Sequence, residues 1–286
     1  MDRVPGTSGG DGSGSLHAPS ENPVSRFDVR TQSFVSPSAY RGRCINSGWH
    51  FDAIGISSLS NLRSLTLRAE DDDGLADMAE LLTTLNANSS TLTHLCLSAY
   101  LARPHSWDSA FQSPTIDHLT CLDLVDTKIS HFVLRRIITC SERLTHLTLH
   151  GTFEDPRSAQ VLFEADHVLE GHHTFLPLLE SFRFLVVDHD DDMALHRAVV
   201  RFVGQRKRLR RLDLGRCPWE LVAMVLPELE GLRAVRVRIG RVVESVIDAL
   251  TKALSEHLVA LHLCAVVADK SLVRPFPFLS RLLVSG

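Results

Sequence analysis

The sequence has few aromatic side chains and no long apolar run. Phe, Trp and Tyr make up 6% of the 286 residues, whereas hydrophobic residues as a whole make up 44%. No stretch approaches the roughly 20 apolar residues that a membrane-spanning helix requires, and the N-terminus has no apolar segment of a secretory signal. We therefore expect no membrane partner and a cytoplasmic or nuclear location.

Paired cysteines and an excess of one charge are also missing. The six cysteines are scattered without a C-x-x-C pair, which fits reduced thiols better than a disulfide framework or a zinc site. The formal net charge of −4 is small for this length, so total charge does not favour nucleic acid or an anionic membrane as a partner. The chain is long and apolar enough for one large core or a repeat array.

Motifs of catalysis and phosphate binding are absent as well. There is no Walker loop, no G-x-G-x-x-G after an expected strand and no H-E-x-x-H. Ser8 has the G-x-S-x-G spacing of a nucleophile elbow, but no strand precedes it. The acidic run 188–192 offers metal ligands, yet it directly precedes an expected helix, where exposed amides favour acidic side chains. We therefore expect no enzyme, no cofactor and no metal site.

Composition divides the chain at about residue 44. Residues 1–44 are rich in Gly, Ser and Pro and poor in large apolar residues, so they cannot bury enough surface to offset the entropy lost on ordering. We expect a disordered N-terminal tail there and a single repeat domain over residues 45–286.

A short leucine pattern returns along the rest of the chain. The pattern is L-x-x-L-x-L, the strand of a leucine-rich repeat, with Phe or Val replacing Leu in some copies. Its nine copies begin at Leu62, Leu92, Leu119, Leu144, Leu179, Leu209, Leu232, Leu258 and Leu279. One copy is weak evidence because leucine is common. Nine copies, about 27 residues apart on average, indicate a repeat protein.

Amphipathic segments between the copies predict helices. They cover residues 75–85, 131–140, 157–169, 193–203, 219–225 and 243–254. Ser130 and Pro218 stand where an N-cap and a first-turn proline belong. Because no single strand–helix unit can bury its own leucine face, neighbouring units must stack. The predicted fold class is α/β, a leucine-rich-repeat solenoid or horseshoe of about nine strand–helix repeats behind the disordered tail.

The residues before, between and after the second and third leucines of each copy predict a binding face. Since side chains alternate along a strand, these residues face the concave solvent side. They include the candidate binding residues Arg68, His94, His146, His150, Arg183, Arg211, Arg236, Arg238, His262 and Arg281, against two acids, Asp123 and Asp213. With neutral histidines, six arginines and two aspartates give this face a formal charge of +4, which predicts attraction of an acidic or phosphorylated protein segment.

Two alternatives for this face stay open. The arginines are solvated strand residues if they pair with the acidic stretches 70–73, 154–155 and 188–192. Nucleic acid is the other alternative, although the face lacks the aromatic side chains on which bases stack. If the histidines contribute, binding of an acidic partner should strengthen as they become protonated below about pH 6.5.

Two stretches resemble the cysteine-containing repeats of F-box proteins. Residues 209–221 (LRRLDLGRCPWEL) match the first half of that pattern, and residues 138–144 (ITCSERL) match its end. From about residue 58 onward, the chain is similar to fungal F-box and leucine-rich-repeat proteins.

In that family the repeat domain recruits a substrate, and a separate F-box docks onto the adaptor of a cullin-RING ubiquitin ligase. The resemblance therefore implies a non-catalytic, substrate-recognition repeat domain. The first 60 residues contain no segment resembling an F-box. Contact with a ligase adaptor is thus expected only if an F-box is present elsewhere, and the alternative is a stand-alone scaffold or inhibitor.

Overall fold

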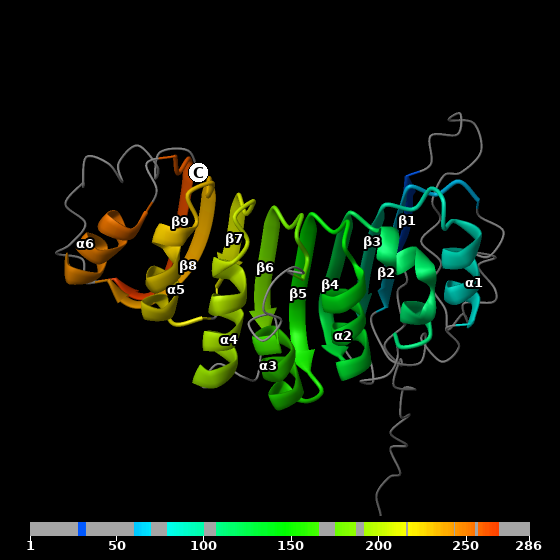
Figure 1. The fold of residues 1–286 in the computed structure, drawn as a ribbon, viewed down its shortest axis with the longest axis horizontal. Coiled ribbons are helices and arrows are strands. Elements are labelled where there is room, and N and C mark those ends of the chain that lie inside the picture. The colour runs from blue at the N-terminus through cyan, green and yellow to red at the C-terminus, as the bar shows by residue number, and fades with distance from the viewer. Residues whose placement is uncertain are drawn as a thin grey trace, which may run out of the picture.

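Parallel strands alternating with helices build the structure, a computed structural model that describes residues 28–32, 60–69, 79–99, 107–165, 175–186, 192–215, 217–242, 244–254 and 257–268. Within these residues nine strands form one sheet, and their order in space follows the chain from β1 to β9. The sheet is open rather than closed into a barrel (Figure 1).

The strands begin where the leucine pattern predicts. They are β2 (Ser64–Ala69), β3 (His94–Ala99), β4 (Cys121–Ile129), β5 (His146–Phe153), β6 (Ser181–Val186), β7 (Arg211–Leu214), β8 (Ala234–Val242) and β9 (Ala260–Ala268). All eight are parallel to their neighbours in this series. Each contains the second and third positions of one copy of the pattern. The ninth copy, from Leu279, lies outside the described residues.

Helices connect most of these strands. They are α1 (Ala79–Ala87), α2 (His131–Cys140), α3 (Pro156–Ala165), α4 (Met193–Gly204), α5 (Trp219–Val225) and α6 (Glu244–Ala253). Two short 3-10 helices, η4 (Ala110–Gln112) and η5 (Pro114–His118), replace an α-helix between β3 and β4, and η6 (Leu226–Glu228) follows α5. Since crossovers between parallel strands are right-handed, strands in sequence order put their helices on one side of the sheet, as Figure 1 shows.

Side-chain caps begin two of the helices as the sequence predicts. Ser130 Oγ accepts a hydrogen bond from the Val133 N–H at 3.1 Å, ahead of α2. Asp192 Oδ1 accepts from the N–H groups of Ala194 and Leu195 at 3.1 and 3.0 Å, ahead of α4. The last residue of the acidic run 188–192 therefore caps a helix, and residues 188–191 lie outside the described residues.

The pattern leucines form two buried rows under the sheet. Strand register aligns Leu65, Leu95, Leu122, Leu147, Phe182, Leu212 and Val235 in one row, all at most 3% exposed. Five phenylalanines occupy the middle of the core, and the rings of Phe163 on α3 and Phe202 on α4 meet edge to face at 5.2 Å. Burial of one such side chain stabilises the fold by about 1.5–3 kcal/mol.

A ladder of shared carbonyls joins successive units where the chain enters each strand. The Thr120 carbonyl accepts from the N–H groups of both Thr145 and His146, at 2.9 and 3.0 Å. The same double acceptance is made by the carbonyls of Arg63, Thr93, Thr145, Glu180, Arg210 and Arg233. The residues of this carbonyl ladder therefore lie side by side, although each is 23 to 35 residues from the next in the sequence.

The pairing of β4 with β5 contains a register shift between Leu124 and Thr127. Asp126 has a φ of 49° there, and Gly151, the partner of Thr127, has a φ of 153°. A Cβ on Gly151 would lie 1.8 Å from the Thr127 carbonyl oxygen. Only glycine fits this close approach of two backbones.

The expectation of a disordered tail is wrong for one stretch. Residues Asp28–Gln32 form β1, which pairs antiparallel with β2 and aligns Val29 with Leu67. The physical reason is that β2 ends the parallel series and its outer N–H and C=O groups need partners. Among the helices of the described residues, none combines the length and apolar character that crossing a bilayer requires.

Candidate functional site

The sheet face opposite the helices, called here the helix-free face, displays the predicted binding residues in rows. The first row contains His94, Cys121, His146, Ser181, Arg211, Ala234 and Ala260, one from each strand from β3 to β9. The second contains Cys96, Asp123, Thr148, Arg183, Asp213, Arg236 and His262. Further along the strands lie Arg68 beside Ser98, His150 beside Leu185 and Arg238 beside Cys264. Arg281 lies outside the described residues.

Two of the predicted arginines share one acid. Arg183 Nε lies 3.1 Å and Arg236 Nη1 lies 3.6 Å from the same oxygen, Asp213 Oδ2. Asp213 Oδ1 also accepts from the Gly215 N–H at 3.2 Å, which orients the carboxylate. Arg183 and Arg236 thus pair with an acid of their own face, whereas the acidic residues 70–73 and 188–191, considered as partners from the sequence, lie outside the described residues. Both arginines are exposed although Asp213 is partly buried, and ion pairs at a protein surface are worth only about 0.2–1 kcal/mol each, so a ligand can exchange with Asp213.

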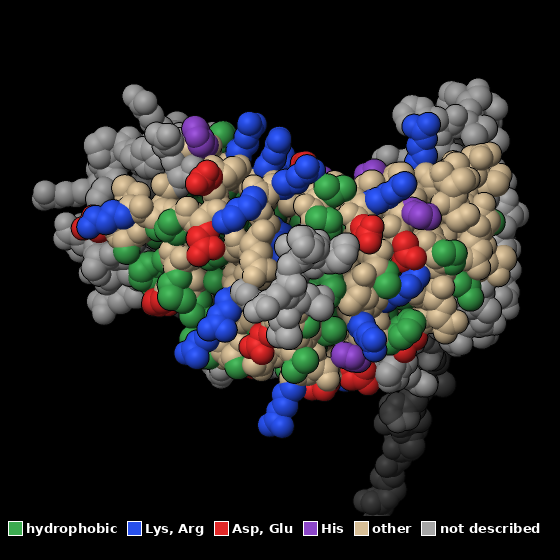
Figure 2. All heavy atoms as spheres, viewed as in Figure 1, with side chains coloured by type: hydrophobic (Ala, Val, Ile, Leu, Met, Phe, Trp, Pro, Cys, Tyr) green, Lys and Arg blue, Asp and Glu red, His purple; other side chains and the backbone are tan. Residues whose placement is uncertain are grey.

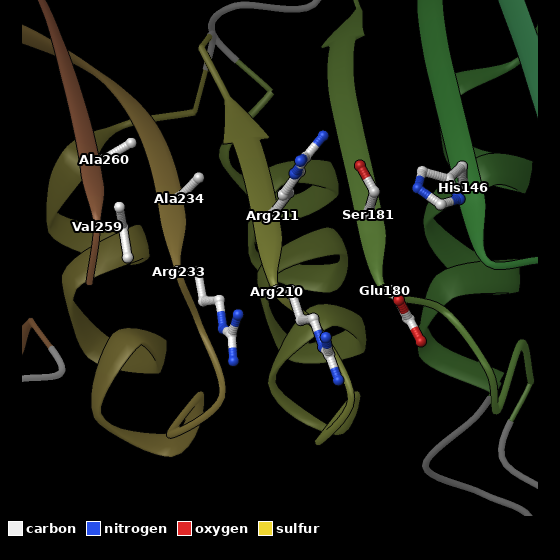
Figure 3. A pocket seen from close by; sticks show the side chains of 9 residues that line it. All are labelled: His146, Glu180, Ser181, Arg210, Arg211, Arg233, Ala234, Val259 and Ala260. Carbon is white, nitrogen blue, oxygen red and sulfur yellow. The ribbon is translucent and has the colours of Figure 1, made fainter. Parts of the chain in front are cut away.

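A pocket of about 460 Å³ opens on this face where β5 to β9 begin (Figure 3). Its lining residues are His146, Glu180, Ser181, Arg210, Arg211, Arg233, Ala234, Val259 and Ala260. Arg211 comes from the first row, whereas Glu180, Arg210 and Arg233 belong to the carbonyl ladder. None of the three arginines forms an ion pair with a described residue. With His146 neutral, three arginines and one glutamate give the pocket a formal charge of +2.

A comparison of this chain with models of known protein families finds no match, and a comparison with curated proteins finds none either. The resemblance to F-box and leucine-rich-repeat proteins therefore rests on the stretches 138–144 and 209–221. Of these, residues 209–221 cover Arg210 and Arg211 of the pocket.

Sequence reasoning missed Arg210, Arg233 and Glu180. The prediction used only the residues that flank the second and third leucines, because side chains alternate between the two sheet faces only within the strand. These three residues instead follow the first leucine of their copies, at Leu209, Leu232 and Leu179. That shared position was the available signal, since the carbonyl ladder brings equivalent residues of adjacent units together.

Three histidines of the face have local partners. His94 Nδ1 lies 2.7 Å from Thr93 Oγ1, and His146 Nδ1 lies 2.8 Å from Thr145 Oγ1. His150 Nε2 lies 3.4 Å from Asp126 Oδ1. His262, on β9, is exposed beside Arg236.

Cys121 is a protonated thiol rather than a nucleophile. Burial, followed by the nearby charges of Asp123 and Cys96, raises its pKa to about 12. Because thiolate is the reactive form, Cys121 is inert at neutral pH. In the described conformation, no three His, Cys, Asp or Glu side chains of the described residues are grouped to hold a metal ion.

Asp155, in the acidic stretch 154–155, caps a helix. Asp155 Oδ1 accepts from the Arg157 N–H at 3.0 Å, at the start of α3. Its pKa is lowered, chiefly by a hydrogen bond from the Ser158 hydroxyl.

The helix side of the molecule carries charges of both signs. Figure 2, in whose view the helices lie in front, shows basic and acidic side chains interspersed on that side.

Proposed function

We propose that this chain is a leucine-rich-repeat protein that recognises another protein and carries out no catalysis itself. The repeated strand–helix unit, the two rows of pattern leucines and the carbonyl ladder support this assignment. Arrays of this kind bury a core only between neighbouring units, and they leave one sheet face open along their length. The helix-free face is the concave side of such an array.

The observation that carries the proposal is the arginine pocket. Arg210, Arg211 and Arg233 contribute guanidinium groups with no ion pair among the described residues, around a cavity large enough to accept a bulky side chain. A guanidinium binds a carboxylate or phosphate through two parallel hydrogen bonds, and arginine is the residue that favours this geometry. The partner we propose is therefore an acidic or phosphorylated segment of a protein.

Residues on either side of the pocket extend the surface. Arg183 and Arg236 become available to a ligand that replaces Asp213 as their partner, because both arginines are exposed and surface ion pairs are weak. Arg238 and His262 continue the surface onto β8 and β9. A segment lying across the strands would meet these cations in succession.

The biological role we propose is substrate recognition of the F-box type, on the basis of the resemblance at 138–144 and 209–221. Contact with a cullin-RING adaptor is part of this proposal only if an F-box is present elsewhere. The alternative is a stand-alone scaffold or inhibitor. Location in the cytoplasm or nucleus and the absence of a nucleic-acid partner stay predictions of this proposal.

A charge-reversal experiment tests the pocket. The variant Arg210→Glu, Arg211→Glu, Arg233→Glu is compared with Arg135→Glu, Arg157→Glu, Arg197→Glu, which makes the same charge change at exposed positions on α2, α3 and α4. Fluorescence anisotropy of a labelled ten-residue glutamate peptide gives the affinity of each chain. We expect at least a tenfold loss in the pocket variant and less than a twofold loss in the helix variant.

Capture from cell extract with the same baits identifies the partner class. An acidic protein retained by the unchanged chain and by the helix variant, but lost from the pocket variant, supports the proposal. A ligase adaptor in the same capture supports the F-box-type role, and its absence with a retained acidic partner supports the scaffold role. Equal losses of peptide affinity in both variants would show that the effect is one of net charge, and the pocket would not be the binding site.

A further inference from the structure

The second row of the helix-free face contains a cluster of two cations and one acid over β6, β7 and β8. Strand register puts Arg183 on one side of Asp213 and Arg236 on the other. Both guanidinium groups lie against one carboxylate oxygen, Asp213 Oδ2, although they come from different strands. The cluster thus marks a point on the face where two arginines hold an anionic oxygen. Two arginines and one aspartate leave it a formal charge of +1, so it still attracts an anion.

Asp213 is less exposed than the arginines that it pairs with. Its side chain is 18% exposed, whereas those of Arg183 and Arg236 are 44% and 39% exposed. A guanidinium has five N–H donors, which a single carboxylate oxygen cannot satisfy. The other oxygen of Asp213 accepts from the Gly215 N–H at 3.2 Å, so the carboxylate keeps a partner when it releases the arginines.

The arginine pocket lies two residues away from this cluster along the same strand. Arg211 of the pocket precedes Asp213 on β7, and side chains two residues apart in a strand share a face at a spacing of about 6.6 Å. Arg211 stands between two small side chains, Ser181 and Ala234, so a ligand group has room beside it (Figure 3). Cations therefore follow one another along β7 at the spacing of a strand.

We propose that Arg183 and Arg236 form a second anion subsite, and that the partner carries two acidic side chains. One enters the arginine pocket, and the other takes the place of the Asp213 carboxylate. An extended peptide presents side chains i and i+2 on one side at the same spacing of about 6.6 Å. The partner segment therefore follows β7 with two acidic residues separated by one other residue. Neighbouring strands are only about 4.8 Å apart, so a segment that crosses them does not match in this way.

Asp213 is an internal competitor for the second subsite. Ion pairs at a protein surface are weak, so a carboxylate of the partner can displace that of Asp213. Because Asp213 has to be displaced, it lowers the gain in affinity that a second acid brings. Removal of its charge should raise that gain. This inference rests on the proposed function, since the first acidic side chain is the one that the arginine pocket binds.

Two peptides of equal composition and charge test the spacing. Each is a labelled ten-residue peptide of eight serines and two glutamates, with Glu-Ser-Glu at the centre of the first and Glu-Ser-Ser-Glu at the centre of the second. In an extended chain the second peptide points its glutamates to opposite sides. Fluorescence anisotropy with the full chain at low ionic strength gives both affinities. We expect the first peptide to bind about threefold more tightly.

Substitutions in the cluster test the second subsite. Asp213→Asn removes the charge and keeps an acceptor for the Gly215 N–H, so it should raise the preference for the first peptide to about tenfold. Asp248→Asn makes the same change at an exposed position on α6 and should leave the preference unchanged. Arg183→Gln should remove the preference while the second peptide still binds. Arg135→Gln, on α2, is its control and should keep the preference.

Circular dichroism establishes that each variant is folded, and the exposed change Arg183→Gln decides the matter if Asp213→Asn does not fold. Equal affinities of the two peptides, both in the unchanged chain and in Asp213→Asn, overturn the inference. A preference that persists in Arg183→Gln overturns it as well.

The triple glutamate variant of the arginine pocket separates this inference from the proposed function. If that variant loses both peptides but neither spacing is preferred by the unchanged chain or by Asp213→Asn, the second subsite is refuted and the pocket stands. If neither peptide binds the unchanged chain, both proposals are overturned.

Discussion

Gly151→Ala tests the close approach of β4 and β5 in the clearest way. The added Cβ would lie 1.8 Å from the Thr127 carbonyl oxygen and 2.8 Å from the Thr127 nitrogen. Because both are backbone atoms, a change of side-chain rotamer cannot relieve the clash. Reaching the 3.0 Å that real Cβ contacts respect requires a shift of about 1.2 Å. Such a shift breaks strand hydrogen bonds worth about 1 kcal/mol each, and the φ of 153° adds about 1–3 kcal/mol of strain.

The expected loss is therefore about 3–5 kcal/mol in the free energy of unfolding. For a folded unit of this size, 1 kcal/mol corresponds to about 2–4 °C, so thermal unfolding followed by circular dichroism should show Tm lower by about 6–20 °C. Gly231→Ala is the matched control, because its Cβ would find the Lys207 and Leu209 carbonyls at 3.5 and 3.6 Å. A loss in Gly151→Ala no greater than in Gly231→Ala would refute the reasoning.

Two other predictions concern buried polar groups. Asn88, fully buried, accepts from the Leu62 N–H and donates to the Thr84 carbonyl, both at 2.8 Å, so Asn88→Ala should cost about 2–4 kcal/mol in urea unfolding. The exposed change Ser89→Ala should cost less than about 0.5 kcal/mol, and equal costs would contradict this account. Cys121 in the folded chain should react with iodoacetamide at pH 8 at least about 100-fold more slowly than in urea, because its pKa is raised to about 12. Peptide mass spectrometry measures both rates, and similar rates would rule out a raised pKa.

The strands could be predicted because burial itself imposes their pattern. Leu65 and Leu67, for example, are at most 2% exposed. Because buried positions of a strand require apolar side chains, the alternation of burial appears directly in the sequence. The helices followed from the 3.6-residue period, and α2 and α5 have the predicted ends. The segment between β3 and β4 differs, since it forms two 3-10 helices instead.

The site was less predictable because it depends on register between distant segments. Arg183 and Arg236 meet at Asp213 only because three strands align at that row. His94, Cys121 and His146 likewise become neighbours across two strand pairings. No local sequence motif records such contacts between distant segments.

The arginine pocket reaches the less tightly packed end of the described sheet. Leu261 and Leu263 on β9 are only partly buried, whereas their counterparts Leu147 and Leu149 on β5 are almost fully buried. The last described strand should therefore open more often than the middle of the array. Because Val259 and Ala260 line the pocket together with residues of β5 to β8, a bound ligand contacts both β9 and the more tightly packed strands. Ligand binding would then stabilise β9, and amide exchange in that strand would report occupancy of a pocket that extends from β5 to β9.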